Sequence, residues 1–215
     1  MRLLLLRHGE TDWNKAHRFQ GQIDIPLNDF GRELAEITRA AAPKIDYDRV
    51  YSSPLCRAYE TAQIFVRDRF PEEEIRKDDR LLEISFGEYE GTDIELASKD
   101  PNHGLYQCLW HPELYVADKG AESFERLVDR AADFLTNEIL PLESLCQNIL
   151  VVAHGALIRA LVVAAGFKEI KDFWGTQYLN CCITTLDISC GTISLLREAE
   201  VYYDPSMLKH HGWKK

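Results

Sequence analysis

Two short apolar runs constrain the fold of this chain more than any other feature. Residues 3–6 read LLLL and residues 149–153 read ILVVA, and neither run alternates apolar with polar residues. Strands covered on both faces have this pattern, which is typical of parallel sheets between helical layers. We therefore expect both runs to be neighbouring parallel strands inside such a sheet.

Further strands and helices are predicted to alternate along the chain. The other strand candidates are residues 48–53, 183–189 and 193–198, the last two forming a hairpin. Apolar residues at three- and four-residue spacing predict helices over residues 29–44, 54–70, 121–140 and 155–166. Pro54 would lie in the first turn of its helix, and Gly166 would end the last one. The alternation predicts an α/β fold, a three-layer α/β/α sandwich with a mostly parallel central sheet.

The length and composition favour one domain. The chain has 215 residues, of which 46% are hydrophobic, enough for a sizeable core, and we expect a single domain over residues 1–215. Residues 84–120 are rich in Gly, Pro and aromatic residues and show no periodicity, so we expect an elaborated, cap-like segment over one sheet edge. Its aromatic residues Tyr106, Trp110 and Tyr115 could line a specificity cap or a small satellite core.

The charge balance and the cysteines limit partners and location. With 25 basic and 35 acidic residues the net charge is −10, which argues against nucleic-acid and anionic-membrane surfaces. The first apolar run stops after Leu6, too early for a secretion signal, and no window could span a membrane. Six cysteines without CxxC spacing predict reduced core residues in a cytoplasmic protein, although Cys181 and Cys182 could form a redox pair. The oligomeric state is left open.

Potentially cationic residues follow three of the predicted strands. Arg7 and His8 end the first run, His154 follows the second, and Arg57 follows residues 48–53 in the first turn of a helix, where free N–H groups favour an anion. Ligands of open parallel sheets bind beyond the carboxyl ends of the strands, so we expect these four residues to meet. Such a pocket suits a small dianion such as phosphate, because guanidinium groups match its oxygens.

A histidine in this pocket could attack phosphorus. If a backbone acceptor holds one ring nitrogen, the other presents a lone pair, and Gly9 would allow the backbone to come close. Two arginines and a second histidine could replace the metal that other phosphoryl-transfer enzymes use. The leaving oxygen needs a proton donor, and Glu83, Glu88 and Glu90 lie in an apolar, glycine-bearing stretch. Their spacing does not choose among them.

Four ordered motifs resemble a known family. The motifs are LRHGETDWN, SSPLCRAYETA, LLEISFGEYEG and VAHGALIRAL, and over roughly residues 1–200 they are similar to the histidine phosphatase superfamily. The relevant branch holds cofactor-dependent phosphoglycerate mutases and their phosphatase relatives, which implies a phosphoglycerate mutase-like fold. The resemblance implies that His8 is the phosphorylated nucleophile, that Glu83 is the proton donor, and that three residues hold the phosphoryl group: Arg7, Arg57 and His154. It also implies substrate-binding positions at Asn14, Gln20, Gly21 and Gly155.

Departures from the mutase pattern favour a phosphatase. Mutases of this type usually carry Arg-His-Tyr-Gly and Leu-Gln-Gly-Leu-Asn-Lys after the acid and Asn-Ser after the second His-Gly, whereas this chain has ISFGEYEGTDIE and Ala156-Leu157. The stretch GAESFERLVDR resembles the Gly-Glu-Ser stretch of the phosphatases, although Ala121 interrupts it. We therefore expect a metal-independent phosphatase of small phosphorylated metabolites without a cofactor. A cofactor-dependent phosphoglycerate mutase is the alternative, and a non-catalytic phosphate-binding protein is a second.

The remaining histidines do not predict a metal site. His17, His103 and His111 are not at ligand spacing, and the tail KHHGWKK (209–215) lacks carboxylate or Cys partners. The tail is expected to be a frayed basic terminus, or alternatively a segment that folds over the pocket.

Overall fold

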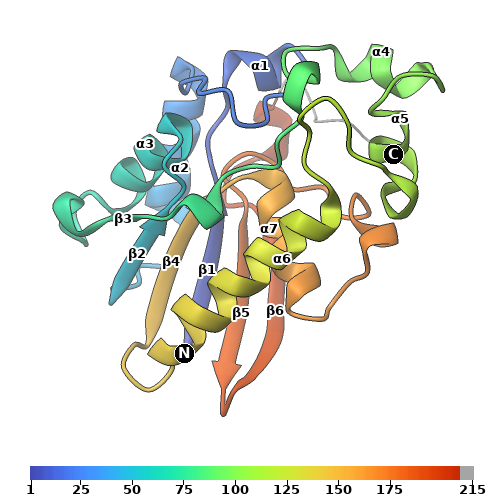
Figure 1. Ribbon diagram of the computed structural model, residues 1–215. Helices are drawn as coiled ribbons and strands as arrows, with labels where there is room; N and C mark the ends of the chain where they lie inside the picture. Colours follow the sequence, from blue (N-terminus) through green and yellow to red (C-terminus); the bar gives the residue numbers. More distant parts are fainter. Residues whose placement is uncertain (209–215) are drawn as a thin grey trace.

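The two apolar runs lie side by side in the centre of a six-stranded sheet (Figure 1). The structure is a computed structural model and describes residues 1–208; the tail 209–215 lies outside the described residues. Strand β1 (Arg2–Arg7) pairs in parallel with β4 (Asn148–Ala153), with Leu3 opposite Ile149 and Arg7 opposite Ala153. The predicted pairing of the two runs is therefore confirmed.

The strand order across the sheet is β3-β2-β4-β1-β5-β6. Strand β2 (Arg49–Ser52) pairs in parallel with β4, and the short strand β3 (Arg76–Lys77) extends the sheet beyond it. On the other side, β5 (Ile183–Ser189) runs antiparallel to β1 and forms the predicted hairpin with β6 (Thr192–Glu200). Strand β3 was not predicted, because both of its residues are charged and exposed.

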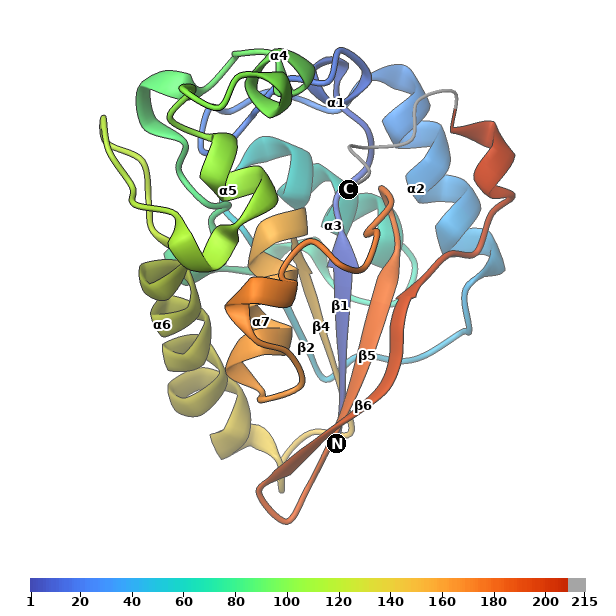
Figure 2. The ribbon, with the colours of Figure 1, turned by 90° about the vertical axis from the view of Figure 1, so that its right-hand side faces the viewer.

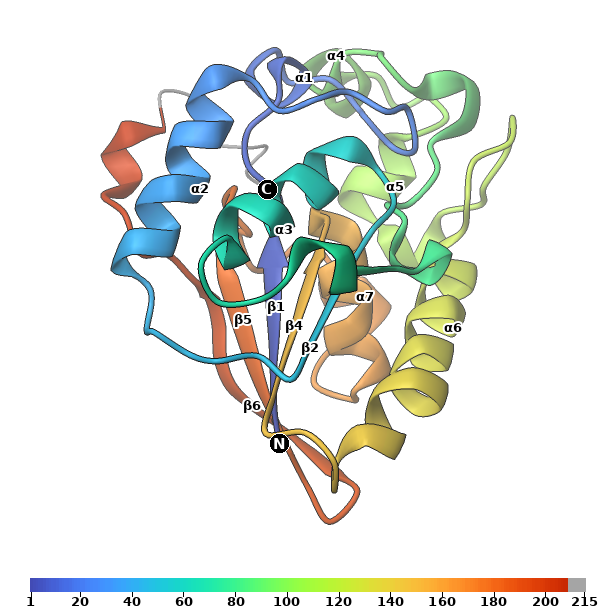
Figure 3. The same ribbon diagram turned by 90° about the vertical axis from the view of Figure 1, so that its left-hand side faces the viewer.

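Helices cover both faces of the sheet, as the non-alternating strands require (Figures 2 and 3). Alternate β1 residues divide between two cores: Leu3 and Leu5 pack with helices α6 (Phe124–Phe134) and α7 (Gly155–Ala164). Leu4 and Leu6 pack on the other face with α2 (Asp29–Ala41) and α3 (Cys56–Val66). The three-layer α/β/α architecture with a mostly parallel sheet is confirmed.

The ends of the helices differ from the sequence prediction where caps decide them. Helix α3 begins at Cys56 with Leu55 as its N-cap, so Pro54 precedes the helix and does not lie in its first turn. Helix α6 begins after Ser123, whose side chain accepts from the N–H of Arg126, and it continues as a π-helical turn, η5 (Leu135–Ile139). Gly166 follows α7 with φ +83°, a conformation that suits glycine at a helix end.

Residues 84–120 lie over the carboxyl ends of the strands, and they are more ordered than predicted (Figure 2). They contain η3 (Gly87–Tyr89), α4 (Ile94–Lys99), α5 (Tyr106–Trp110) and η4 (Pro112–Leu114). These helices are too short for apolar periodicity to reveal. Tyr115 is buried and packs on Phe124 with ring centroids 5.7 Å apart, so it belongs to the core on the α6 side of the sheet.

The remaining helices are short connections: α1 (Asp12–Lys15), η1 (Glu72–Glu74), η2 (Asp79–Leu81), η6 (Leu140–Leu142), η7 (Ile170–Asp172) and η8 (Pro205–Met207). Within residues 1–208 no helix combines the length and the apolarity needed to cross a membrane. All six cysteines are free thiols in the structure, and Cys181 and Cys182 are fully buried.

Candidate active site

The residues expected to bind phosphate meet in one pocket of about 180 Å³ at the carboxyl ends of β1, β2 and β4. The pocket is lined by every predicted site residue except His154: Arg7, His8, Asn14, Gln20, Gly21, Arg57, Glu83 and Gly155. His154 lies directly behind it, with its ring edge-on to His8 and the ring centroids 5.1 Å apart. The convergence expected from the strand ends is thus observed.

His8 is held with one ring nitrogen toward the backbone. His8 follows β1, and its backbone N–H donates to the carbonyl of Ala153 at 3.0 Å. This hydrogen bond extends the β1–β4 ladder by one residue. Its ring Nδ1 pairs with the carbonyl of Gly9 at 2.6 Å. Burial, and then the charges of Arg57 and Arg7, lower the pKa of His8 well below its ordinary value. The neutral ring must donate from Nδ1 to that carbonyl, so Nε2 carries the lone pair.

His154 is also fully buried and is the N-cap residue of α7. Its Nε2 pairs with the hydroxyl of Ser53 at 2.8 Å, while its buried Nδ1 has no partner among residues 1–208. Burial is the largest cause that lowers the pKa of His154 well below its ordinary value, followed by the charge of Arg57. A ligand bound beside His8 can therefore form a hydrogen bond with this buried ring nitrogen.

Arg7 and Arg57 bring positive charge to the pocket without a carboxylate partner in the described part of the chain. Arg57 is fully buried and donates to the carbonyls of Gly21 and Ile23, both at 2.8 Å. Arg7 donates to the carbonyl of Tyr178. In both arginines Nε is buried without a partner. Two fixed guanidinium groups with unused donors form a site for an anion.

The N-terminus of α3 contributes less than predicted. The N–H of Cys56 already donates to the carboxylate of Asp24 at 2.7 Å, so this end of the helix is occupied by an acidic side chain of the protein itself. The contribution of α3 to the pocket is therefore the Arg57 side chain.

The structure distinguishes the three candidate glutamates. Only Glu83 lines the pocket; its carboxylate accepts from the backbone N–H groups of Ala156 and Leu157 at 3.1 and 3.0 Å, at the start of α7. Glu88 is exposed. Glu90 accepts from three backbone N–H groups, each at 3.0 Å, and so holds the surrounding loops together.

The loop after β1 is held by short polar contacts. Asn14 caps the turn by accepting from the N–H of Thr11, and the Thr11 hydroxyl donates to the carboxamide oxygen of Gln20 at 2.9 Å. The NH₂ group of Gln20 is therefore the part that can donate to an anion. Gly21 has φ +54°, and a Cβ there would lie 1.9 Å from a Glu90 oxygen, so only glycine fits.

Gly9 has a different role from the one predicted. A Cβ at Gly9 would lie 2.5 Å from the carbonyl oxygen of Gly31, so the missing side chain makes room for α2. The N–H of Gly9 donates to the hydroxyl of Thr61 at 3.1 Å. Close approach is thus required for helix packing, because both the N–H and the space beside Gly9 are used by the protein.

Sequence reasoning missed several polar residues that line the pocket, among them Arg159 and Asn180. Arg159 stacks on the ring of Tyr178 at 4.4 Å, and burial, followed by the charge of Arg7, lowers the pKa of Arg159 to about 10. Its position four residues after Gly155, one helical turn away, was an available signal. Asn180 donates to the carbonyls of His8 and Gly9 at 3.1 and 3.0 Å, and its loop carries no periodic pattern.

Within residues 1–208, no three His, Cys, Asp or Glu side chains are grouped so that they could hold a metal ion. None of Tyr106, Trp110 and Tyr115 is among the described residues that line the pocket; the segment 84–120 contributes Phe86, Ile94 and Leu109 instead.

Comparison with known proteins identifies the family. The model of the histidine phosphatase superfamily (branch 1) matches residues 3–200. The chain belongs to the histidine phosphatase superfamily. A Bacillus subtilis relative, the uncharacterised phosphatase PhoE, is 32% identical over 189 residues, which cover 86% of this chain and 87% of the relative.

Solved structures of similar proteins share the fold. YhfR of Bacillus stearothermophilus superposes with a TM-score of 0.81 at 28% identity, covering 93% of this chain and 97% of YhfR. A mutant phosphoserine phosphatase of Entamoeba histolytica in complex with phosphoserine has a TM-score of 0.78 at 28% identity, covering 91% of this chain and 95% of that protein. The family and the enzyme class expected from the sequence, phosphoric monoester hydrolases, are confirmed.

Proposed function

We propose that this protein is a metal-independent phosphatase that hydrolyses small phosphorylated metabolites through a phosphohistidine at His8. The observation that carries the proposal is the buried, neutral His8 ring, which points Nε2 away from its Gly9 bond and is surrounded by unpaired donors of Arg7, Arg57 and His154. Preorganised donors of this kind stabilise the charge that develops on a transferring phosphoryl group.

The first step forms the phosphoenzyme. Nε2 of His8 attacks phosphorus, the bond from phosphorus to the leaving oxygen breaks, and the carboxyl of Glu83 gives its proton to that oxygen. In the second step a water gives its proton to the Glu83 carboxylate and attacks phosphorus, and the phosphorus–nitrogen bond breaks. Inorganic phosphate leaves, and both side chains return to their initial states.

His154 would act as a neutral donor to the phosphoryl oxygens. The N–H of Leu55 donates to the Ser53 hydroxyl oxygen at 3.4 Å, which leaves the hydroxyl hydrogen for Nε2 of His154. With its pKa lowered, the ring keeps one proton, which then lies on Nδ1, the unpartnered atom.

The residues after His154 favour hydrolysis over mutase chemistry. Ala156 and Leu157 offer no side-chain polar group at the position where mutases of this type carry Asn-Ser. Their backbone N–H groups bind Glu83 instead. Neither side chain can therefore form a hydrogen bond with a released phosphoglycerate.

The direct test compares two reactions of the purified chain. We expect release of p-nitrophenol from p-nitrophenyl phosphate, and negligible conversion of 3-phosphoglycerate to 2-phosphoglycerate with or without 2,3-bisphosphoglycerate. Robust conversion with negligible hydrolysis would favour the mutase. A panel of phosphorylated metabolites, including phosphoserine, sugar phosphates and nucleotide monophosphates, then identifies the preferred leaving group.

The phosphohistidine is tested by replacing the nucleophile. His8→Ala is expected to lower kcat by about a thousandfold or more and to abolish the acid-labile phosphate adduct seen by mass spectrometry after rapid quenching. His111→Ala, at an exposed histidine outside the pocket, is the control and should keep the native kcat and the phosphate adduct. Binding of phosphate without any turnover by the native chain would support a binding protein instead.

A further inference from the structure

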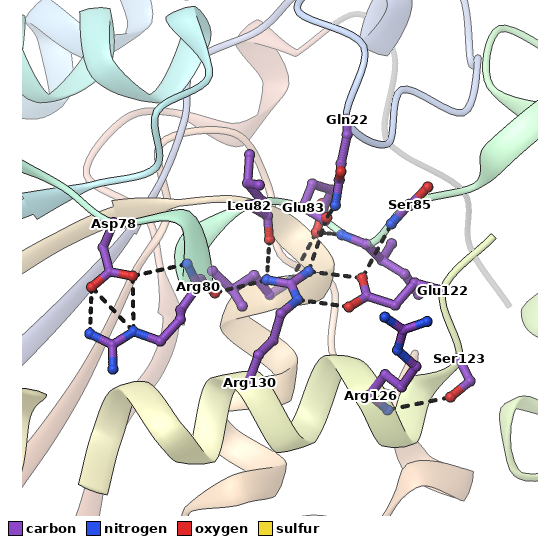
Figure 4. Close-up of polar contacts among 12 residues, drawn as sticks. Gln22, Asp78, Arg80, Leu82, Glu83, Ser85, Glu122, Ser123, Arg126 and Arg130 are labelled. Atoms are coloured by element: carbon purple, nitrogen blue, oxygen red, sulfur yellow. Dashed lines mark hydrogen bonds and ion pairs between the residues drawn. The ribbon is translucent and has the colours of Figure 1, made fainter. Parts of the chain in front are cut away.

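Arg130 packs against the segment that carries Glu83, although it does not line the pocket (Figure 4). It lies on α6, 47 residues after Glu83 in the sequence. The Arg130 side chain is 18% exposed, and that of its ion-pair partner Glu122 is 12% exposed. An ion pair this well covered needs good geometry and further hydrogen bonds to repay its desolvation.

All five N–H donors of Arg130 are used. Two of them bind the Glu122 carboxylate, from Nε at 2.8 Å and from Nη2 at 2.9 Å. The other three bind the carbonyl oxygens of Arg80, Leu82 and Glu83 at 2.8, 2.6 and 3.0 Å. Arg7, Arg57 and Arg159, which line the pocket, each keep a buried Nε without a partner. Arg130 therefore holds backbone, whereas the other three have donors left for a ligand.

Residues 82–86 need such contacts because they lie between η2 and η3, outside any helix or strand. Their carbonyl groups have no ladder of their own and must find partners elsewhere. Gln22 donates to the carbonyl of Glu83 at 3.0 Å from the opposite side, and Glu122 exchanges backbone and side-chain hydrogen bonds with Ser85. Figure 4 shows Arg130 and Gln22 meeting at the Glu83 carbonyl, with the contact between Glu122 and Ser85 beside it.

The Glu83 side chain reaches from this anchored backbone to the start of α7, where its carboxylate meets two N–H groups. Helix α6 thus fixes one end of the residue and helix α7 the other. The carboxyl can meet a leaving oxygen only if the backbone end is held in place, and a displacement of about 1 Å can cost on the order of a hundredfold in rate.

We propose that Arg130, oriented by Glu122, is the positioning residue for the proton donor Glu83. This inference rests on the proposed function, in which Glu83 protonates the leaving oxygen. Because Arg130 does not touch the phosphoryl pocket, its loss should impair protonation of the leaving group and spare phosphoryl binding and attack by His8.

The test uses two aryl phosphate esters whose leaving groups differ in their need for protonation. Phenol is a poor leaving group and requires protonation as the phosphorus–oxygen bond breaks, whereas 2,4-dinitrophenolate leaves as an anion. For Arg130→Met we expect kcat/KM, which reports formation of the phosphoenzyme, to fall about tenfold or more with phenyl phosphate and less than about threefold with 2,4-dinitrophenyl phosphate. Glu83→Gln should show the same selectivity with a larger loss.

Control variants separate positioning from stability. Arg126→Met removes an exposed arginine one turn earlier on α6 and should leave kcat/KM unchanged with both esters. Glu122→Gln removes the charge that orients Arg130 and should reproduce the selectivity in weaker form. If Arg130→Met does not fold, Arg130→Lys keeps the charge but not the fork of donors, and the same selective loss is expected.

If Arg130→Met lowers kcat/KM equally with both esters, or with neither, the inference is overturned. A residue that only stabilises the fold would not discriminate between leaving groups. A failure of the proposed function gives a different result. If the loss of kcat/KM in Glu83→Gln does not depend on the leaving group, Glu83 is not the proton donor, and this conclusion does not depend on the Arg130 variants.

Discussion

At the scale of single residues, burial determines the charge states in the pocket. His8 and His154 are both within a few per cent of complete burial and are surrounded by the guanidinium groups of Arg7 and Arg57. Both effects disfavour a second proton on either ring. The same arrangement that makes His8 a neutral nucleophile also leaves positive charge available for a phosphoryl group.

The titration of His8 follows from this arrangement. Because the pKa of folded His8 lies well below its ordinary value of 6.5, its ring should stay neutral as the pH falls through 6.5. The unfolded chain takes up the proton first, so this group makes the folded state less stable as the pH decreases below 6.5, by at most about 1.4 kcal/mol per pH unit. Proton NMR of the His8 ring measures the midpoint; a midpoint at or above 6.5 would contradict the assignment. Arg57→Met should raise the midpoint, since it removes one of the lowering charges.

Gly21 provides a second test at a single residue. Gly21→Ala places a methyl group against the Glu90 carboxylate, which should displace the Gly21 carbonyl from Arg57 and lower kcat/KM by about tenfold or more. Gly191→Ala is a matched control: Gly191 has φ +71° and nothing within 4 Å, so the substitution brings the same backbone strain without the clash. Equal activity of the two variants would show that the contact does not matter.

At the scale of secondary structure, the pocket forms where strands end and helices begin. Strands β1 and β4 deliver His8 and His154, α3 delivers Arg57, and the first turn of α7 binds the Glu83 carboxylate. Helix α2 supports the loop after β1, because Gly31 packs directly on Gly9. The N-terminus of α2 is fixed by Asn28, which accepts from the N–H of Gly31 at 2.7 Å.

Removing this cap should destabilise the protein. Asn28→Ala loses the N-cap acceptor and the hydrogen bond to the Glu10 carboxylate at 2.9 Å, and we expect the free energy of unfolding to fall by about 1–2 kcal/mol. Urea denaturation measures the change. Asn28→Ser keeps a cap acceptor and should lose less; if both variants lose the same amount, the contact to Glu10 and not the cap is responsible.

At the scale of the whole molecule, the protein holds an excess of buried positive charge in an acidic chain. Arg7, Arg57 and Arg159 lie around one pocket and form no ion pair within the described residues, while the chain as a whole carries a net charge of −10. An anion that binds only the folded state relieves this imbalance and stabilises the fold. The cytoplasmic location expected from the cysteines remains a prediction.

Inorganic phosphate or orthovanadate should therefore raise the midpoint of thermal unfolding. At a hundred times the Kd the gain is about 2.7 kcal/mol, and it should saturate with concentration. Arg57→Met should lose most of the shift, whereas Arg126→Met, on the surface, should keep it. A shift that is equal in the native chain and in Arg57→Met would place the anion elsewhere. Sulfate at the same ionic strength controls for general salt effects.

Much of the pocket was predictable because its residues are close in sequence to strands with a strong signal. The ends of two apolar runs located Arg7, His8 and His154, and the family motifs added Glu83. Helices α3 and α6 begin two and three residues later than predicted, at Cys56 and Phe124. The start of a helix depends on capping contacts that apolar periodicity does not show.

The sequence by itself determined the layers of the fold and the type of chemistry, because both follow from local patterns: non-alternating apolar strands, helical spacing, and His-Gly endings. Only the tertiary structure decided that Gly9 serves helix packing and that Asn180 and Arg130 hold the site in place. These contacts join residues that lie far apart along the chain, such as Arg130 and Glu83, and they are made to irregular backbone. Irregular backbone has no repeating pattern, so its hydrogen-bond partners are set by the folded neighbours and cannot be read from the sequence around it.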